Sequence, residues 1–298
     1  MKIIGAGLSG CIAGLIFGDA EILEKNKGMR TNHQGLLRFR SNRLSELTGI
    51  PFKKIEITKS IWDGENFSQP NPKLVNLYSQ KVTGHIIDRS ISNIDPGVRY
   101  IAPQDFHEQL QYQLRNRLHY GCDINMGDIG MDPVISTIPL GTTLSQLAGY
   151  EDIVPELVHS KIHITKYIIP DCDIYQTIYF PMNSTLVYRA SLTGEMLIIE
   201  SLHNPTPMEI DNILCLFGIN CWVDEPVYSG NQSFGKIVPL DDTKRKRLLY
   251  HLSHNNNIWS LGRYACWRNI LLDDVLEDAY HIRRMINQEI YDIRKGIE

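Results

Sequence analysis

Residues 1–25, MKIIGAGLSGCIAGLIFGDAEILEK, carry the clearest fold signal of the chain. A short apolar strand runs directly into the glycine turn GAGLSG, and a helix-forming stretch follows. In a GxGxxG turn of this kind, the first glycine, Gly5, permits the tight turn. Gly7 leaves room for a pyrophosphate beside the backbone, and Gly10 lets the helix pack closely on the strand. The pattern therefore predicts strand, glycine turn and helix.

A second strand, AEILEK at residues 20–25, completes this unit. It ends at Glu24, where a carboxylate can accept hydrogen bonds from both hydroxyls of a ribose. The backbone N–H groups of Leu8 and Ser9 lie at the start of the preceding helix and face the anion. Together these features predict a dinucleotide-binding unit, and the acid argues against a ligand with a 2′-phosphate.

The second informative stretch is IWSLGRYACWRNILLDDVLEDAYHIRRMI at residues 258–286, which reads as a strand, a Gly-Arg turn and an amphipathic helix. With FGKIVPLDDTKRKRLLYHLSHNNN before it, this segment resembles the C-terminal part of UDP-galactopyranose mutases. More broadly, it resembles the flavoprotein superfamily that includes amine oxidases and protoporphyrinogen oxidases. The resemblance implies an FAD cofactor and a chain that returns at its end to the FAD domain.

The resemblance also implies particular cofactor contacts near this turn. By this resemblance, Gly262 and Arg263 would lie over FAD, and the following helix start would face the pyrimidine edge of the flavin through Leu272, Asp273, Asp274 and Val275. A helix N-terminus carries about half a positive charge and stabilises an anionic reduced flavin. For the two aspartates, simple charge matching to the helix N-terminus is the alternative explanation.

A third match to the superfamily follows the second strand. Its EKxxxxGGR motif is similar to EKNKGMR, in which Glu24, Lys25, Gly28 and Arg30 match and Met29 replaces a glycine. The resemblance implies that Lys25 and Arg30 also contact the cofactor.

The middle of the chain is rich in β-branched and aromatic residues, as in KIHITKYIIP, DIYQTIYFP and TLVYRASLTGEMLIIESL. These stretches predict an antiparallel sheet. The expected fold is therefore mixed: an α/β Rossmann-type FAD-binding domain interleaved with an antiparallel-sheet substrate domain. The expected boundaries are 1–37, 84–150 and 235–298 for the FAD-binding domain, and 38–83 and 151–234 for the substrate or cap domain.

Alternation along the predicted strands indicates which side chains share a face. Tyr175, Thr177 and Tyr179 fall on one face, and one face of this sheet should cover the flavin and form the substrate pocket. Arg38 and Arg40 also alternate, so both can project from one face as a fork for a carboxylate or phosphate, the alternative being solvated strand residues. The other pocket candidates are Lys59, Tyr179, Arg189 and Trp267, and no catalytic residue is assigned.

Composition removes several other classes of function. The 298 residues carry 30 basic and 34 acidic side chains, a net charge of −4, so there is no global attraction to nucleic acid or anionic lipid. The only dense basic run is at 244–247, on a predicted helix where a solvated face is the simpler explanation. The spacing of cysteines and histidines matches no metal site, and no apolar run reaches the length of a membrane span. We therefore expect a cytoplasmic protein with no metal and no membrane partner.

The leading functional hypothesis is an FAD-dependent, amine-oxidase-like oxidoreductase or lyase that acts on a C–N bond of an amine or amino acid substituent. GLLRFRS, YQTIYFP and LGRYACWRN also resemble compact flavoproteins of bacteriophages. That resemblance implies a DNA-modification role on an amino acid-modified thymine of phage DNA, in the host cytoplasm. The expected partner is thus a small-molecule or modified-base substrate.

Two alternatives remain open. One is a sugar-nucleotide isomerase similar to UDP-galactopyranose mutase. The mutases carry two tyrosines after the Gly-Arg turn that hold the diphosphate, whereas here Trp267 takes the first place and Asn269 or Ile270 the second. The other alternative is a flavin-binding module without turnover.

Overall fold

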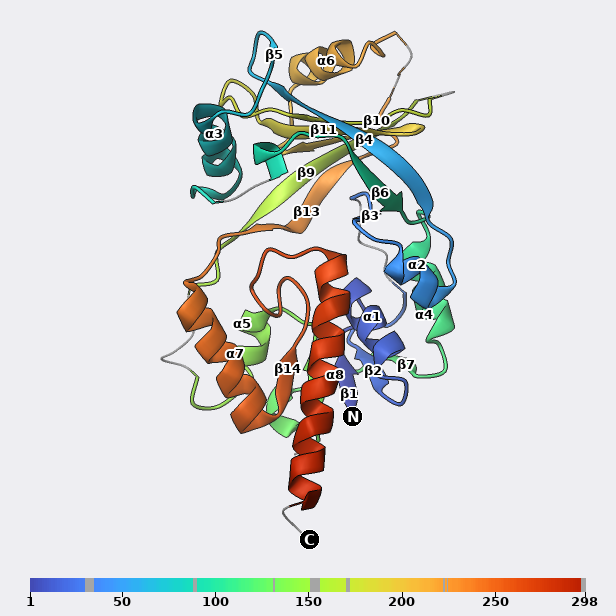
Figure 1. Ribbon diagram of the computed structural model, residues 1–298, viewed down its shortest axis with the longest axis vertical. Helices are drawn as coiled ribbons and strands as arrows, with labels where there is room; N and C mark the ends of the chain where they lie inside the picture. The colour runs from blue at the N-terminus through green and yellow to red at the C-terminus, as the bar shows by residue number, and fades with distance from the viewer. Residues whose placement is uncertain are drawn as a thin grey trace.

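Two β-sheets, one above the other in Figure 1, organise the chain. The computed structural model describes residues 1–29, 35–87, 90–130, 132–150, 156–169, 172–221, 223 and 225–295. The lower sheet holds the N-terminal strand, and the upper sheet is built mainly from the middle of the chain. The last helix, α8 (Leu272–Lys295), begins beneath the upper sheet and runs away from it.

The lower sheet has five parallel strands in the order β14, β8, β1, β2, β7. Its apolar residues face two separate cores: Ile3 and Ile135 face one, while Ile4 and Val134 face the other. A parallel sheet needs this cover on both faces. The strands are β1 (Lys2–Ile4), β2 (Glu21–Glu24), β7 (Leu118–Tyr120), β8 (Val134–Ser136) and β14 (Ile258–Ser260).

Helices provide that cover. Residues of α1 (Leu8–Ile16), α4 (Phe106–Gln113) and α8 build the core on one face. Residues of α5 (Leu140–Leu144) and α7 (Asp242–Asn256) build the core on the other. This is the two-sided arrangement of a Rossmann-type unit. No helix in the described part of the chain is both long and apolar enough to span a membrane.

The upper sheet runs in the order β13, β9, β12, β11, β10, β4, β6, β3, with β5 paired to β4. Neighbours are antiparallel except β10 and β4, which are parallel. The strands are β3 (Arg38–Phe39), β4 (Lys53–Trp62), β5 (Phe67–Ser68), β6 (Gly97–Ile101), β9 (His159–Ile168), β10 (Tyr175–Tyr179), β11 (Val187–Thr193), β12 (Met196–Ser201) and β13 (Tyr228–Ile237).

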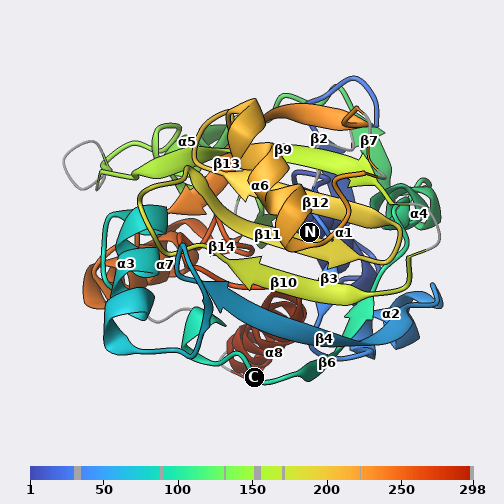
Figure 2. The same cartoon turned by 90° about the horizontal axis from the view of Figure 1, so that it is seen from above.

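Different partners cover the two faces of the upper sheet. Helix α6 (Pro207–Leu216) lies over the outer face, as seen from above in Figure 2. Helix α3 (Pro72–Thr83) packs on the inner face at one end, and the rest of that face is turned toward the lower sheet. The short helix α2 (Arg43–Thr48) and two 3₁₀ turns, Ser90–Ser92 and Met126–Asp128, complete the described elements.

The predicted mixed fold is confirmed, as is the alternation along β10. Ile178 belongs to the core under α6, whereas Tyr179 belongs to the core on the inner face. Strand β13 of the upper sheet extends past the expected boundary at 235. Strand β6 lies in the stretch 84–150, which was expected in the FAD-binding domain, but it pairs with β4 and β3 of the upper sheet. Its partners lie far away in the sequence, so a local pattern did not indicate the pairing.

Candidate functional site

The glycine turn between β1 and α1 forms a cradle of backbone groups. Gly5 has a φ of +95°, which favours glycine, and a Cβ on Gly10 would lie 1.9 Å from the carbonyl oxygen of Gly5. A Cβ on Gly7, by contrast, would meet no atom within 4 Å, so this side of the turn is open. Within the described residues, no hydrogen-bond acceptor pairs with the N–H groups of Leu8, Ser9 or Gly10. This open helix N-terminus is suited to a phosphate group.

Glu24 lies beside this cradle at the end of β2. Its Oε2 accepts the N–H of Ala6 at 2.7 Å, and its Oε1 accepts the backbone N–H of Asn26 at 2.9 Å. Oε1 also accepts the side-chain amide of Asn26 at 2.5 Å, so both of its lone pairs are used, whereas Oε2 retains one lone pair for a ribose hydroxyl. Lys25 instead forms an exposed ion pair with Asp123 at 3.0 Å. Arg30 lies outside the described residues.

Helix α4 supports the turn from below through two residues that were not predicted. His107 Nε2 and Gln111 Nε2 both contact the carbonyl oxygen of Ala6, at 2.9 Å and 3.0 Å. Burial lowers the pKa of His107, although the hydrogen bond to Ala6 opposes that shift. The signal in the sequence is a polar pair spaced i, i+4 on a helix that otherwise buries Phe106 and Leu110.

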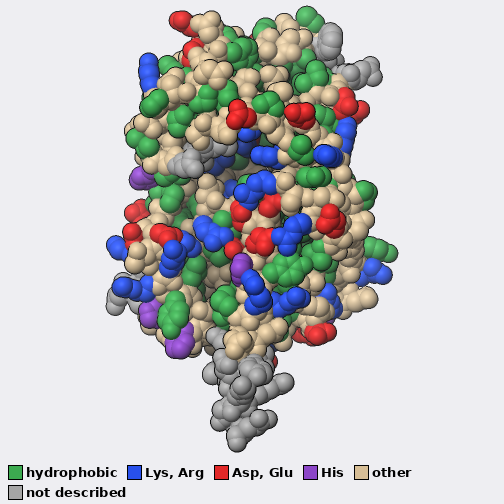
Figure 3. Space-filling view, in the orientation of Figure 1, with side chains coloured by type: hydrophobic (Ala, Val, Ile, Leu, Met, Phe, Trp, Pro, Cys, Tyr) green, Lys and Arg blue, Asp and Glu red, His purple; other side chains and the backbone are tan. Residues whose placement is uncertain are grey.

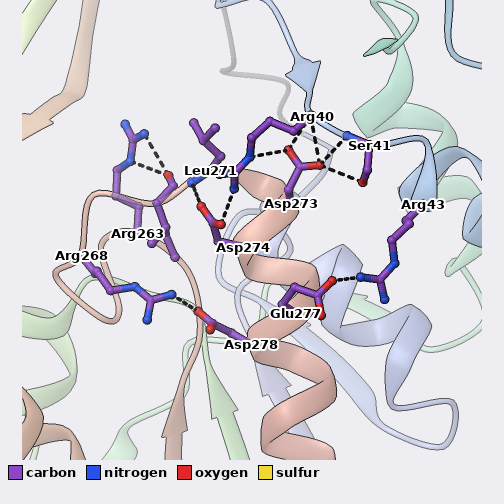
Figure 4. Close-up of polar contacts among 11 residues, drawn as sticks. Arg40, Ser41, Arg43, Arg263, Arg268, Leu271, Asp273, Asp274, Glu277 and Asp278 are labelled. Carbon is purple, nitrogen blue, oxygen red and sulfur yellow. Dashed lines mark hydrogen bonds and ion pairs between the residues drawn. The ribbon is translucent and has the colours of Figure 1, made fainter. Parts of the chain in front are cut away.

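The Gly-Arg turn after β14 packs against the same cradle. Gly262 has a φ of +102°, and a Cβ there would lie 2.5 Å from the Oγ of Ser9. The next residue, Arg263, donates from Nε and Nη2 to the carbonyl oxygen of Ile270, at 3.3 Å and 3.0 Å (Figure 4). The turn therefore joins the start of α1 to a loop that Arg263 holds closed.

The two aspartates at the start of α8 bind the segment that follows β3. Asp273 accepts the backbone N–H groups of Arg40 and Ser41, at 3.0 Å and 3.2 Å, and the hydroxyl of Ser41 at 3.1 Å. Asp274 forms an ion pair with the guanidinium of Arg40 and also accepts the N–H of Leu271 at 2.8 Å (Figure 4). Their side chains therefore have structural partners, and the helix start contributes its positive potential.

A group of cationic side chains lies where the inner face of the upper sheet meets the Gly-Arg turn. We call Arg38, Arg189, Lys236 and Arg263 the cationic cluster. Register places Tyr179 opposite Arg189 and Arg189 opposite Glu200 on neighbouring strands. In Figure 3, Lys and Arg side chains also gather on the surface between the upper and the lower part of the molecule. Four positive groups and one buried carboxylate thus share this region.

Glu200 organises the cluster. Its Oε2 is ion-paired with Nε of Arg189, and its Oε1 accepts the hydroxyl of Tyr188 at 3.1 Å. The Nζ of Lys236 lies 4.9 Å from the centroid of the Tyr188 ring. Burial alone would raise the pKa of Glu200, but Arg189 and Lys236 lower it to about 2. The carboxylate is therefore ionised at neutral pH and orients Arg189.

The cations of the cluster also act on one another. Arg38 donates from Nη1 to Thr177 Oγ1 at 2.9 Å, and burial together with the charge of Arg189 lowers its pKa to about 10. Burial likewise lowers the pKa of Arg263, and Arg189 adds to that effect. Like charges held together in a partly buried region favour an anionic ligand between them.

Two of the predicted pocket residues, Arg40 and Lys59, have other roles. Arg40 does not form a fork with Arg38: β3 ends at Phe39, and Arg40 turns instead to Asp273 and Asp274. Lys59 donates to the carbonyl oxygen of Asn93 at 3.1 Å. The expectation of a shared face for the two arginines was wrong because the strand is only two residues long.

Trp267 is also placed differently from a pocket-lining aromatic residue. It is buried, has a φ of +45°, and donates from Nε1 to the carbonyl oxygen of Val238 at 2.9 Å. Its ring packs edge-on against Tyr264 and His159. Trp267 thus fastens the loop after the Gly-Arg turn to the end of β13.

The residues present fit a dinucleotide along the upper edge of the lower sheet. The cradle at Gly7 is open to a phosphate, the N–H groups of the first turn of α1 face it, and Glu24 is ionisable and adjacent. Gly262 brings the second turn within contact distance of the first. Backbone and carboxylate groups therefore match the requirements of a pyrophosphate and a ribose.

Comparison with known proteins agrees with this architecture. No family model matches the sequence, and no curated protein matches it. A reduced UDP-galactopyranose mutase is similar, with a TM-score of 0.67 and 13% identity over 96% of this chain and 93% of the mutase. HpxO of Klebsiella pneumoniae, complexed with FAD and uric acid, has a TM-score of 0.53 and 12% identity over 94% of this chain and 78% of its own.

A redesigned putrescine oxidase gives a TM-score of 0.55 and 10% identity, over 96% of this chain and 98% of the oxidase. At these identities the likeness concerns the fold. The chain therefore has the fold of these proteins, a Rossmann-type α/β part joined to an antiparallel sheet.

Proposed function

We propose that this chain binds FAD and oxidises a C–N bond of an amine that also carries an anionic group. The single observation that carries the proposal is the cationic cluster, which adjoins the Gly-Arg turn and so adjoins the dinucleotide cradle. A site that places several guanidinium groups beside a cofactor cradle is suited to an anionic substrate. The similarity in fold to a putrescine oxidase supports amine oxidation, and the similarity to HpxO, which was crystallised with FAD, supports FAD as the cofactor.

Each part of FAD has a matching group in this assignment. The N–H groups of Leu8, Ser9 and Gly10 would bind the pyrophosphate, and Glu24 would bind the ribose. The Gly262 turn and the start of α8 would hold the flavin end. When bound, FAD would accept the hydride, two electrons with one hydrogen, that the carbon of an amine loses as the amine becomes an imine, and the proton lost from nitrogen would pass to water.

The chain itself would bind and orient the substrate. The guanidinium groups of Arg38 and Arg189 would bind a carboxylate, and Glu200 with Tyr188 holds Arg189 in place. The positive potential at the start of α8 favours negative charge beside it. Such positioning is the main contribution a flavoenzyme makes, so the absence of an assigned catalytic base does not argue against the proposal.

The alternative is a sugar-nucleotide isomerase similar to UDP-galactopyranose mutase. The cationic cluster is also compatible with a diphosphate, which is the observation that keeps this candidate. Against it, the tyrosine pair expected after the Gly-Arg turn is absent from the sequence, and Trp267 is buried against Val238. A flavin-binding module without turnover would retain the cradle but would not need the cluster.

Anaerobic mixing followed by absorption spectroscopy separates these candidates. An amino acid-substituted pyrimidine nucleoside, free and within DNA, is the first substrate to test. We expect it to bleach the blue flavin band of the oxidised protein, whereas UDP-galactose should leave that band unchanged. Formation of UDP-galactofuranose by the dithionite-reduced protein, with no bleaching by any amine, would replace the amine oxidation proposal with the isomerase. No reaction with either substrate class would favour the non-catalytic module.

A further inference from the structure

Arg38 and Arg189 differ in how their positive charges are balanced. The guanidinium of Arg189 is ion-paired with the carboxylate of Glu200, so its charge is neutralised by an acid of the same sheet. Among the described residues, the acceptor that the half-buried guanidinium of Arg38 contacts is a neutral hydroxyl, Thr177 Oγ1, at 2.9 Å. A guanidinium carries five N–H donors, and this contact uses one of them. Of the two arginines, Arg38 therefore keeps more of its charge and of its donors for a ligand.

The side chain of Arg38 crosses the inner face of the upper sheet to make this contact. Strands β6 and β4 lie between β3, which carries Arg38, and β10, which carries Thr177. A long side chain of this kind has many rotamers unless its end is held. Thr177 holds that end from within the sheet. The orientation of the guanidinium thus depends on one hydroxyl of an interior strand.

A second hydroxyl holds the first. Thr177 and Ser191 pair in register on β10 and β11, and their Oγ atoms lie 3.1 Å apart. Both residues are buried, with 3% and 5% of their surface exposed. Because Arg38 can only donate, Thr177 accepts from it and can donate its own proton to Ser191. That direction strengthens the Thr177 oxygen as an acceptor, so the three residues form one hydrogen-bonded chain.

This chain lies beside the rest of the candidate substrate site. Ser191 is two residues from Arg189 on β11, and Tyr179, two residues from Thr177 on β10, pairs in register with Arg189. Alternation along the strands places all four side chains on the same face. We propose that Thr177 is a positioning residue: with Ser191 behind it, it holds the guanidinium of Arg38 in the orientation that binds the anionic group of the substrate. The assignment of that group to an amine substrate rests on the proposed function, whereas anion binding at Arg38 requires no flavin.

Calorimetric titration of the purified full-length chain with benzoate tests this role, because benzoate supplies one carboxylate and undergoes no reaction. We expect saturable binding that weakens about fivefold in Thr177→Val, the scale for ordering one long side chain. Thr177→Ser keeps the hydroxyl and should retain the binding. Thr193→Val is the matched control: Thr193 lies two residues from Ser191 on β11 and pairs with Tyr175, and within the described part of the chain it donates no hydrogen bond to and accepts none from Arg38.

A double-mutant cycle separates positioning from a general effect on the fold. Arg38→Ala should weaken benzoate binding about thirtyfold, the scale of losing hydrogen bonds to a charged group. In the Arg38→Ala background, Thr177→Val should cause no further loss, because there is no guanidinium left to position. An equal loss in both backgrounds would show a merely structural Thr177 and overturn the proposal. Unchanged affinity in Thr177→Val, or a wild-type protein that binds no benzoate, would also overturn it.

Flavin bleaching by the amine substrate, measured on the same variants, tests the proposed function separately. Benzoate binding that depends on both Arg38 and Thr177, in a protein whose flavin no amine bleaches, would support the positioning role and contradict the proposed function. Bleaching that needs the same amine concentration in Thr177→Val as in the wild type would support the proposed function and overturn the positioning role.

Discussion

The dinucleotide cradle and the cationic cluster are neighbours in space, yet they are built in opposite ways. The cradle consists mostly of backbone groups within residues 5–10, with one carboxylate from the next strand. The cluster consists entirely of side chains, which come from β3, β11, β13 and the loop after β14. A backbone site depends on the few residues that permit its turn, whereas a side-chain site depends on how distant strands pair. The two should therefore fail in different ways when they are mutated.

The largest effect is expected at Gly10. A Cβ there would lie 1.9 Å from the backbone oxygen of Gly5, and neither backbone can move without separating α1 from β1. We expect Gly10→Val to lower the free energy of unfolding by about 5 kcal/mol, at the upper end of single-residue effects. Chemical denaturation followed by circular dichroism measures the loss.

Gly7→Ala is the matched control within the same turn. A Cβ on Gly7 meets no atom within 4 Å, and its φ of −66° suits any residue. This variant should fold like the wild type while retaining less FAD, because the methyl group occupies the open side of the cradle. Equal stability of Gly10→Val and Gly7→Ala would contradict the assignment of a close helix–strand contact.

The next effect is expected in the cluster, at Glu200. Glu200→Gln leaves the guanidinium of Arg189 partly buried without its ion partner, which should lower the free energy of unfolding by about 3 kcal/mol. The folded-state pKa of Glu200 is about 2, below its ordinary value of 4.5. The stabilisation it gives is therefore complete above about pH 4.5 and is lost as the pH falls toward 2.

Denaturation of the wild type and of Glu200→Gln across that pH range provides the measurement. The difference between the two proteins should be largest near neutral pH and should shrink as the solution is acidified. A difference that stays constant from pH 7 to pH 3 would show that the ionised carboxylate of Glu200 is not what stabilises Arg189.

A smaller effect is expected at Glu24, on binding and not on folding. Glu24→Ala removes the carboxylate proposed to bind the ribose, so the affinity for FAD should fall by about 2 kcal/mol, the usual scale for hydrogen bonds to a charged group. Fluorescence titration of the apoprotein with FAD measures this loss. Lys25→Ala is the neighbouring control, since Lys25 pairs with Asp123 in an exposed position. Unchanged affinity in Glu24→Ala would remove Glu24 from the site.

The smallest effect separates Arg40 from Arg38. The side chain of Arg40 is 48% exposed and pairs with Asp273 and Asp274, so Arg40→Ala should cost less than about 1 kcal/mol of stability. It should leave substrate binding intact. Arg38→Ala should instead weaken the binding of an anionic substrate, measured by the concentration needed to bleach the flavin. If both variants impaired bleaching equally, the predicted fork would be favoured over the cluster described here.

The fold could be predicted largely from local sequence. The GAGLSG turn, the terminal Glu24 and the LGR turn each lie within one short segment, and their geometry follows from glycine positions. The alternation of faces along β10 was also predicted correctly, because it depends only on consecutive residues of one strand. Support from His107 and Gln111 was not predicted, because only the tertiary packing of α4 brings them to Ala6.

The candidate substrate site was harder to predict, for a physical reason. Arg38 and Arg40 looked equivalent in sequence, yet the strand ends between them and the two side chains part. Glu200 and Lys236 carried no local signal, because their roles arise from the register of β11, β12 and β13 with their neighbours. Long-range strand pairing therefore decides which charges meet, and no single segment encodes it.

FAD binding at the glycine cradle is the central claim, and the absorption spectrum of the purified full-length protein tests it most directly. We expect bands in the near-ultraviolet and the blue, either as purified or after reconstitution with FAD, and release of the flavin when the protein is denatured. A folded protein that is colourless and cannot be reconstituted with FAD would contradict the claim.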